Sequence, residues 1–295
     1  MRNRIKLSYW NIKDIPNFGD LLSPYIIKKL TNRDISYIEW YFGIKRILKT
    51  IILSVLMGKW EKLRELHYPF EKVILGVGSI LSFSSPGCIV WGSGFMNYNE
   101  KFRGGRILLV RGPVTRDMLL KQKFKCPMKY GDPAILLPLI YNPVKKIKYK
   151  IGIIPHWKET SYFKDNYSSL YHIIDLRTTE IEKTIDEILS CSYILSTSLH
   201  GLIVSHSYGI PALWIQNNNI DTDGFKFADY FASVKIQQYK GFINIKDILK
   251  SEERILSLFK EYHYLSLPQI DINIIQKTIL ETAPFKIKNN IINLI

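Results

Sequence analysis

Short apolar segments bounded by glycine, proline and asparagine alternate along the chain with longer segments in which apolar residues recur at helical spacing. The short segments predict β-strands, and the longer ones predict helices. Because the two kinds alternate, the pattern predicts an α/β protein built on parallel sheets. Strands are expected at residues 5–10, 35–40, 72–75, 88–91, 106–110, 150–154, 171–175, 193–195 and 210–215.

The alternation is interrupted near the middle of the chain. Asn142-Pro143 is followed by closely spaced lysines, and the strand–helix pattern then begins again. We therefore expect a Rossmann-like domain at residues 1–145, a second at 146–265, and a C-terminal helix and tail at 266–295. The predicted architecture is two Rossmann-like domains that face a central cleft.

The densest group of reactive side chains lies at residues 196–201, with the sequence STSLHG. This segment follows an expected strand and precedes an apolar segment that predicts a helix, so it should form a tight corner. The free N–H groups and the positive dipole end of a helix attract anions. His200 can transfer protons near neutral pH. The corner therefore predicts a site for an acidic substrate.

Arg111 also stands at a strand end, two residues before Pro113, which suits the first position of a helix. Its guanidinium can hold a carboxylate or phosphate by two parallel hydrogen bonds. A surface salt bridge fits this position equally well.

Gly78-Ser79 and Gly92-Ser93 follow two further expected strands. Glycine allows a ligand or a neighbouring helix to approach the backbone closely. These positions predict a cleft at the carboxyl edge of the sheet. Neither completes the GxGxxG pattern, so no dinucleotide cofactor is expected.

Asn17, Gly19 and Asp20 lie where a loop meets a helix that should end near Leu30. We expect Asp20 to cap this helix, and Asp132 to cap the apolar segment that follows it. From spacing alone, these structural roles are favoured over a role in the site.

Residues 44–66 predict a basic helix with a broad apolar stripe that is too short to span a bilayer. Packing in the core and contact with a membrane surface both fit this stripe. Its apolar members are Ile47, Leu48, Ile51, Ile52, Val55 and Leu56, and the flanking cations are Lys45, Arg46, Lys49, Lys59 and Lys62.

The net charge of +15 favours anionic partners. Nucleic acid is not expected, because the chain has neither zinc-finger spacing nor an RNA-binding aromatic stripe. Cys88, Cys126 and Cys191 are too scattered for a disulfide framework and predict buried thiols in the cytoplasm. Peripheral contact with the inner face of the membrane is compatible with that location. No histidines have metal-ligand spacing, so no metal is expected.

Six motifs resemble, in the same order, those of the polysaccharide pyruvyl transferases. They are Asn17-x-Gly19-Asp20, Arg111-Gly112-Pro113, Gly131-Asp132-Pro133-Ala134, Ile154-Pro155-His156, Ser198-Leu199-His200-Gly201 and Lys226-Phe227-x-Asp229-Tyr230. The chain looks most like the members that add ketal pyruvate to bacterial exopolysaccharides such as succinoglycan and xanthan. The resemblance implies a fold like that of GT-B glycosyltransferases.

It also implies phosphoenolpyruvate as a co-substrate, no further cofactor, and a sugar acceptor that is often linked to polyprenyl diphosphate. His200 is the implied catalytic residue. The residues implied for binding the pyruvyl donor are Arg111, Arg116, His156, Ser198, Leu199, Gly201 and Lys226. The residues implied for the acceptor side or the cleft are Asn17, Gly19, Asp20, Gly78, Ser79, Gly92, Ser93 and Asp132.

One position departs from the family pattern. Several family members carry an arginine directly before the Leu-His pair, where this chain has Ser198. We expect Lys226 to supply the missing cation. Two other functions fit the same residues: a GT-B glycosyltransferase that uses a nucleotide sugar, and a non-catalytic basic module that binds anionic glycans or membranes.

Overall fold

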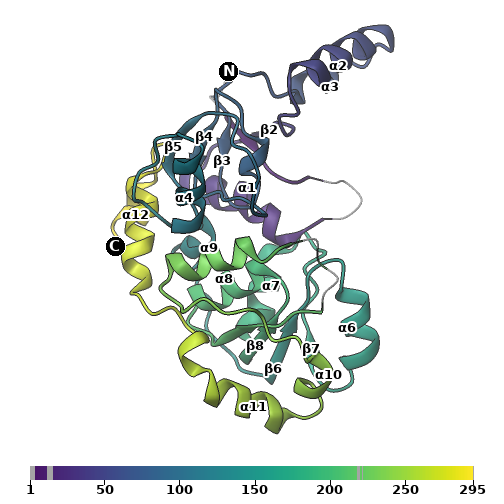
Figure 1. Ribbon diagram of the computed structural model, residues 1–295, viewed down its shortest axis with the longest axis vertical. Coiled ribbons are helices and arrows are strands. Elements are labelled where there is room, and N and C mark those ends of the chain that lie inside the picture. The colour runs from purple at the N-terminus through teal and green to yellow at the C-terminus, as the bar shows by residue number, and fades with distance from the viewer. Residues whose placement is uncertain (1–3, 12–15, 218–219, 221, 295) are drawn as a thin grey trace.

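The computed structural model describes residues 4–11, 16–217, 220 and 222–294, and its strands form two parallel sheets (Figure 1). The first sheet has the strand order β2-β1-β3-β4-β5, and the second has the order β7-β6-β8-β9. All nine expected strands are present. Their bounds are Ile5–Ser8 (β1), Ile35–Tyr37 (β2), Ile74–Leu75 (β3), Ile89–Trp91 (β4), Arg106–Leu109 (β5), Tyr149–Ile154 (β6), His172–Ile173 (β7), Cys191–Ser196 (β8) and Ala212–Trp214 (β9).

Helices connect the strands and cover the sheets. Those of the first half are α1 (Phe18–Thr31), α2 (Ile44–Leu56), α3 (Glu61–Glu65), the 3₁₀ turn η1 (Leu81–Phe83), α4 (Pro113–Lys121), η2 (Pro133–Leu136) and α5 (Leu137–Ile140). Those of the second half are α6 (Thr160–Tyr167), α7 (Ile181–Leu189), α8 (Leu199–Ser207), α9 (Phe225–Ser233), α10 (Ile245–Ile248), α11 (Glu252–Glu261), η3 (His263–Leu265), α12 (Ile272–Glu281) and α13 (Asn289–Ile292).

Both sheets place their first strand in the interior. β1 pairs in parallel with β2 on one side and β3 on the other, and β6 pairs in the same way with β7 and β8. The strand order thus reverses direction at β1 and β3, and again at β6 and β8. Ligands of open α/β sheets bind outside the carboxyl ends of strands at such points. The architecture is compatible with the predicted pair of Rossmann-like domains, while the GT-B likeness and the boundary at 145/146 stay predictions.

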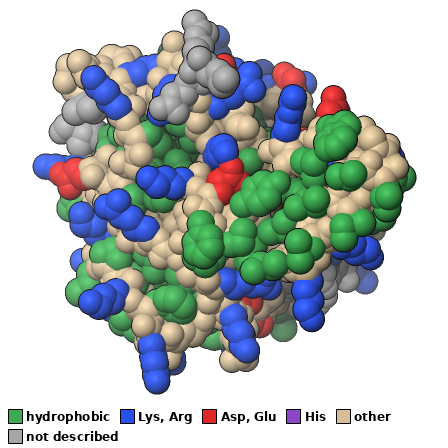
Figure 2. Space-filling model, turned by 90° about the horizontal axis from the view of Figure 1, so that it is seen from above, with side chains coloured by type: hydrophobic (Ala, Val, Ile, Leu, Met, Phe, Trp, Pro, Cys, Tyr) green, Lys and Arg blue, Asp and Glu red, His purple; other side chains and the backbone are tan. Residues whose placement is uncertain are grey.

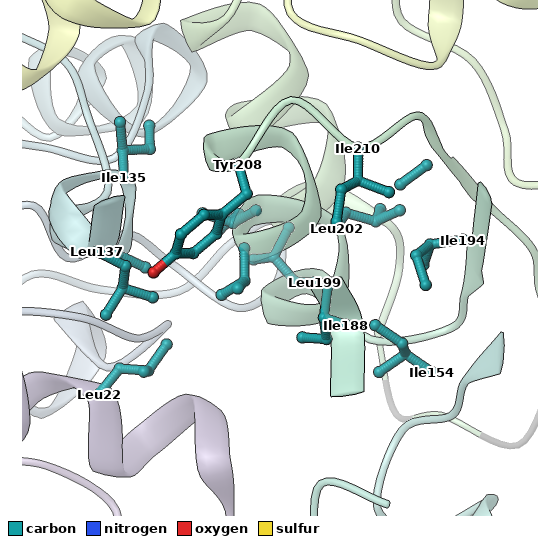
Figure 3. Packing of buried hydrophobic residues seen from close by; sticks show 14 of the residues in the cluster. Leu22, Ile135, Leu137, Ile154, Ile188, Ile194, Leu199, Leu202, Tyr208 and Ile210 are labelled. Carbon is teal, nitrogen blue, oxygen red and sulfur yellow. The ribbon is translucent and has the colours of Figure 1, made fainter. Parts of the chain in front are cut away.

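One apolar core runs through both halves. Figure 3 shows Tyr208, directly after α8, pointing toward Ile135 and Leu137 of the first half. Leu22 of α1 belongs to the same cluster. Because burial of apolar surface is the main favourable term in folding, this shared core holds the two sheets together.

The C-terminal helix α12 returns to the first half and lies beside it (Figure 1). The indole Nε1 of Trp91 donates to the Ile279 carbonyl at 3.0 Å, and the Gln276 amide donates to the Ile135 carbonyl at 3.0 Å. The expected C-terminal helix therefore packs against the domain that is remote from it in sequence.

The predicted apolar stripe of residues 44–66 is only partly buried. Ile47 is 8% exposed and joins Tyr41 and Leu66 in a small separate cluster. By contrast, Ile52 is 59% exposed and Leu56 is 76% exposed, so the alternative of packing in the core is wrong for much of the stripe. Within the described residues, no helix has the length and apolar character needed to cross a bilayer.

A buried ion pair joins the start of α4 to α9. Arg111 Nε donates to Asp229 Oδ2 at 2.9 Å, and both side chains are fully buried. Thr115 donates to the same carboxylate from its backbone N–H and from its hydroxyl, each at 2.7 Å. A Cβ atom at Gly112 would lie 1.9 Å from the Asp229 carbonyl oxygen, so only glycine allows this approach. The surface salt bridge considered for Arg111 is therefore an interior one.

Replacing Asp229 with alanine should leave the Arg111 charge buried without its partner. We expect Asp229→Ala to lower the free energy of unfolding by about 3–5 kcal/mol in urea titrations. Asp247→Ala removes an exposed carboxylate paired with Arg254 and should cost less than about 1 kcal/mol. Equal costs for the two variants would contradict this account.

Candidate active site

A cavity of about 330 Å³ lies where the carboxyl ends of both sheets meet. Its size falls in the range of small-molecule sites. The first half lines it with Trp10, Asn17, Asp20, Trp40, Ser79, Ile80, Ser82, Phe83, Met96 and Glu100. The second half lines it with His156, Trp157, Lys158, Ser198, Leu199, His200, Ile220 and Lys226. The cavity thus lies at the reversal points of both sheets, as topology predicts.

Three helices present their N-termini to this cavity. Asn17 is the N-cap of α1, Ser198 is the N-cap of α8, and Lys226 is the second residue of α9. Each terminus carries unsatisfied N–H groups and a partial positive charge. Their convergence, together with the Lys226 ammonium, makes the cavity favourable for an anion.

The cap of α1 differs from the one predicted. The Asn17 side chain accepts from the Gly19 N–H at 3.2 Å, so Asn17 caps the helix and the prediction for Asp20 is wrong. Asp20 lies in the first turn instead, where its Oδ2 accepts from the Asn17 side-chain amide at 2.7 Å. The predicted cap by Asp132 is confirmed, because its Oδ1 accepts from the Ala134 N–H at 2.9 Å.

The three hydroxyl residues at the corner have different surroundings. The hydroxyls of Ser196 and Thr197 bond to the backbone, whereas Ser198 lines the cavity. Ser196 Oγ donates to the Ile154 carbonyl at 2.8 Å, and Thr197 Oγ1 accepts from the His156 N–H at 2.7 Å. Both bonds tie the corner to the end of β6. Ser198 lines the cavity, and its side chain makes no capping hydrogen bond to α8.

His200 is held between the two halves of the molecule. Its Nε2 lies 3.8 Å from Asp132 Oδ2, and neither buried atom has a hydrogen-bond partner among the described residues. On the other side, a Cβ atom at Gly19 would lie 2.3 Å from His200 Nδ1. The glycine of the first motif is therefore required for the imidazole to pack against α1.

Burial and nearby charges give His200 and Asp132 unusual proton affinities. Burial, followed by the charges of Lys226 and Arg111, lowers the pKa of His200 to about 3. Burial raises the pKa of Asp132 to about 6, against the effect of the Ala134 N–H and of Arg111. At neutral pH the imidazole is therefore uncharged and faces a carboxylate. A proton on Nε2 would be directed at Asp132.

Two further groups in the cavity titrate near neutral pH. Burial raises the pKa of Asp20 to about 7, although Lys226 and the Asn17 amide oppose it. Burial and the charge of Arg111 lower the pKa of Lys226 to about 8. Within the described part of the chain, the Lys226 ammonium makes no hydrogen bond, and it lies 5.4 Å from the centre of the Phe227 ring. Lys226 is thus a buried cation available to a ligand.

Arg111 does not line the cavity, but its charge affects the pKa values of groups that do. Its side chain has no exposed surface, and its remaining hydrogen bonds go to Ser79 Oγ at 2.6 Å and the Phe95 carbonyl at 2.7 Å. Arg116 lies outside the cavity, where its Nε donates to the Cys126 carbonyl at 3.3 Å. A direct role for either arginine in binding a pyruvyl donor stays a prediction.

The predicted glycines mostly allow protein segments to approach one another. A Cβ atom at Gly92 would lie 2.3 Å from Pro133, and one at Gly201 would lie 2.4 Å from Ser196 Oγ. Ser93 Oγ donates to the Gly78 carbonyl at 2.8 Å. These residues shape the walls behind the cavity, whereas Ser79 lines it directly.

An aromatic wall in the first half was missed by the sequence analysis. The rings of Trp10 and Trp40 lie 4.6 Å apart, and those of Trp40 and Phe83 are stacked at 3.9 Å. Both tryptophans were placed at the carboxyl ends of expected strands, which is the signal that could have identified them. The buried cysteines, by contrast, were predicted correctly, and all three are free thiols.

The fold and the site together define an α/β protein with a cavity between two parallel sheets, lined by a buried lysine and the N-termini of helices. The family model described as polysaccharide pyruvyl transferase matches residues 12–219, which is more than half of the chain. This chain belongs to that family, as the six motifs predicted. The matched range ends before α9, which carries Lys226 and Asp229.

A relative with no assigned activity also matches. An uncharacterized protein of Acanthamoeba polyphaga mimivirus is 32% identical over 184 residues. The match covers 57% of this chain and 63% of that protein, which is less than two thirds of its length. The particular similarity to enzymes of succinoglycan and xanthan synthesis stays a prediction.

The raised pKa of Asp20 should make the free energy of unfolding depend on pH. The folded state binds the Asp20 proton more tightly than the unfolded chain does, so this contribution is full below about pH 4 and is lost as pH rises through about 7. Asp20→Asn keeps the side chain neutral. As the pH rises from 5 to 8, the wild type should therefore lose stability that the variant keeps. We expect the unfolding free energy of the variant to rise by about 2 kcal/mol relative to that of the wild type over this range.

Urea titrations at the two pH values measure this difference. Asp247→Asn, at an exposed carboxylate of α10, controls for the loss of a surface charge. If the difference between Asp20→Asn and the wild type stays constant with pH, Asp20 does not hold its proton as described.

Proposed function

We propose that this protein transfers a pyruvyl group from phosphoenolpyruvate to a sugar of a surface polysaccharide, or of its lipid-linked precursor, and forms a pyruvate ketal. The observation that carries the proposal is the buried Lys226 ammonium at the meeting point of three helix N-termini. The same cavity holds Asp20, whose pKa is about 7, and the imidazole of His200. Phosphoenolpyruvate carries a phosphate and a carboxylate, which the cationic groups can bind. Addition to its double bond requires groups that donate and accept protons.

The reaction requires one proton to be delivered to carbon. Protonation of the methylene carbon of phosphoenolpyruvate creates a cation-like centre, to which one sugar hydroxyl adds with loss of its proton. The carbon–oxygen bond to phosphate then breaks, and a second hydroxyl closes the ketal. The balance is phosphoenolpyruvate plus a diol giving a ketal and inorganic phosphate.

Two groups can share the proton transfers. Asp20 carries a proton for part of the time at neutral pH, because its pKa is about 7. His200 is neutral because burial disfavours its charged form and because Lys226 and Arg111 repel a proton. A bound trianion would offset those cations and raise the pKa of His200. The binding of the pyruvyl donor would therefore prepare His200 for its role in acid–base catalysis.

The aromatic wall suits the acceptor. Trp10, Trp40 and Phe83 line the cavity from the first half with large flat apolar surfaces, whereas Ser198 and Lys226 line it from the second half. A sugar ring could lie against this wall while its hydroxyls face Asp20 and His200. Lys226, which lines the same cavity as Ser198, is well placed to supply the cation that several family members take from the position of Ser198.

The experiment that tests the proposal is incubation with phosphoenolpyruvate and a panel of glycans and lipid-linked saccharides, followed by measurement of phosphate release. Phosphate release that requires a glycan, with a pyruvate ketal in the product by mass spectrometry, would support it. Turnover of nucleotide sugars in the absence of any reaction with phosphoenolpyruvate would replace it with the glycosyltransferase alternative. Salt-sensitive glycan binding that His200→Ala leaves unchanged, without turnover, would support the non-catalytic module.

Loss of the imidazole should stop catalysis without unfolding the protein. We expect His200→Asn to lower kcat/KM by about a hundredfold or more in this assay. His263→Asn, at an exposed histidine in η3, is the matched control and should retain activity. A His200→Asn variant with wild-type rates would remove His200 from the mechanism.

Loss of the buried ammonium should weaken binding of the pyruvyl donor. Lys226→Met keeps most of the length of the side chain and removes its charge, so we expect KM for phosphoenolpyruvate to rise by about 10- to 100-fold. The exposed Lys250 provides the control Lys250→Met. An unchanged KM for phosphoenolpyruvate in Lys226→Met would show that another cation binds this substrate.

A further inference from the structure

The helix α2 and Trp60, the residue before α3, carry an exposed apolar face that does not line the cavity. We define this apolar face by Ile44, Leu48, Ile52, Val55, Leu56 and Trp60, each of which is about half exposed or more. Figure 2 views the molecule from the end that carries these helices and shows hydrophobic side chains gathered on one side of it. Isolated exposed apolar residues are ordinary, but a contiguous group of this kind marks an interaction surface.

Helix geometry concentrates these residues on one side of α2. At 3.6 residues per turn, Ile44, Leu48, Ile52 and Val55 fall within an arc of about 80°. A different arc, which contains Ile47 and Ser54, packs against the protein. The helix therefore has two apolar sides, one facing its own small core and one facing outward.

Cations border the apolar face. Lys45 and Lys49 lie beside it on α2, and Lys59 and Lys62 lie beside Trp60; all four side chains are exposed. Residues 44–66 contain six basic and two acidic side chains, which gives them a net charge of +4. An apolar strip next to positive charge matches the boundary between acyl chains and anionic headgroups.

We propose that the apolar face binds the surface of a bilayer that contains anionic lipids. The apolar side chains enter the boundary of the acyl region, and the lysine stems extend along them so that the ammonium groups reach the headgroups. Trp60 suits the interface, because its ring is apolar and its N–H is polar. This binding leaves α2 lying on the membrane, in agreement with its length of 13 residues.

The apolar face adjoins the wall of the cavity. Phe42, two residues before α2, has the centre of its ring 5.6 Å from that of Phe83 and 6.5 Å from that of Trp40, and both of these residues line the cavity. The Arg46 guanidinium lies 4.5 Å from the centre of the Phe42 ring. A docked protein would thus hold its aromatic wall close to the headgroups. If the proposed function holds, a lipid-linked acceptor could enter the cavity from the bilayer; the docking itself does not depend on that function.

Sedimentation of the full chain with vesicles tests the proposal. Vesicles of phosphatidylcholine containing phosphatidylglycerol should bind the protein, and binding should fall when salt is raised or when phosphatidylglycerol is left out. Ile52→Glu should reduce the partition coefficient by about tenfold or more. The matched control is Ile274→Glu on α12, where the isoleucine is 56% exposed against 59% for Ile52, and it should bind as the wild type does.

Two further measurements keep the outcome clear. Brominated lipids should quench tryptophan fluorescence in the wild type, and Trp60→Phe should lose most of that quenching. Circular dichroism and thermal melting confirm that the variants fold. The proposal is overturned if anionic vesicles do not bind the protein, or if Ile52→Glu and Ile274→Glu bind equally. It is also overturned if Ile52→Glu only converts a dimer to a monomer in sedimentation velocity, because the face would then be a contact between copies.

Discussion

The Asp229 carboxylate is carried by α9 but satisfied by groups from the first half of the chain. It accepts from Arg111 Nε and from two donors of Thr115, in a place without access to water. A buried charge pair costs desolvation energy that is recovered only when the geometry is good and the remaining hydrogen bonds are made. The two halves must therefore meet in one arrangement, and that arrangement positions α9 and Lys226 over the cavity.

The same constraint adds to the effect of burial on the pKa values of the site. Arg111 is held inside by Asp229, and its charge helps to lower the pKa of both His200 and Lys226. His200 also depends on the first half through Asp132 and Gly19. Its unusual proton affinity is a property of the closed interface and not of α8 alone. The titratable groups of the cavity therefore have these pKa values only when both halves are in contact.

Much of this fold could be predicted from residue patterns, because buried parallel strands are short apolar runs with clear boundaries. The corner at His200 and the start of α4 were found for the same reason. The pairing of His200 with Asp132 could not be predicted, because it depends on how two sheets remote in sequence pack together. The choice of Asn17 over Asp20 as the cap was also beyond reach, since both residue types are good caps and a one-turn difference decides between them. The exposure of Ile52 could not be predicted, because the sequence pattern of an apolar stripe is the same whether the stripe packs against protein or against lipid.

The small cluster of Tyr41, Ile47 and Leu66 is separate from the cores beneath the two sheets. A segment with so little buried apolar surface of its own forms an independent unit of stability, which can open at a free energy well below that of global unfolding. The amide hydrogens of α2 would then exchange with solvent sooner than those of α1 or α8, and a protease would cut there first. Substitutions in this segment could accordingly change the outward surface while the cavity between the sheets and the Arg111–Asp229 ion pair stay intact.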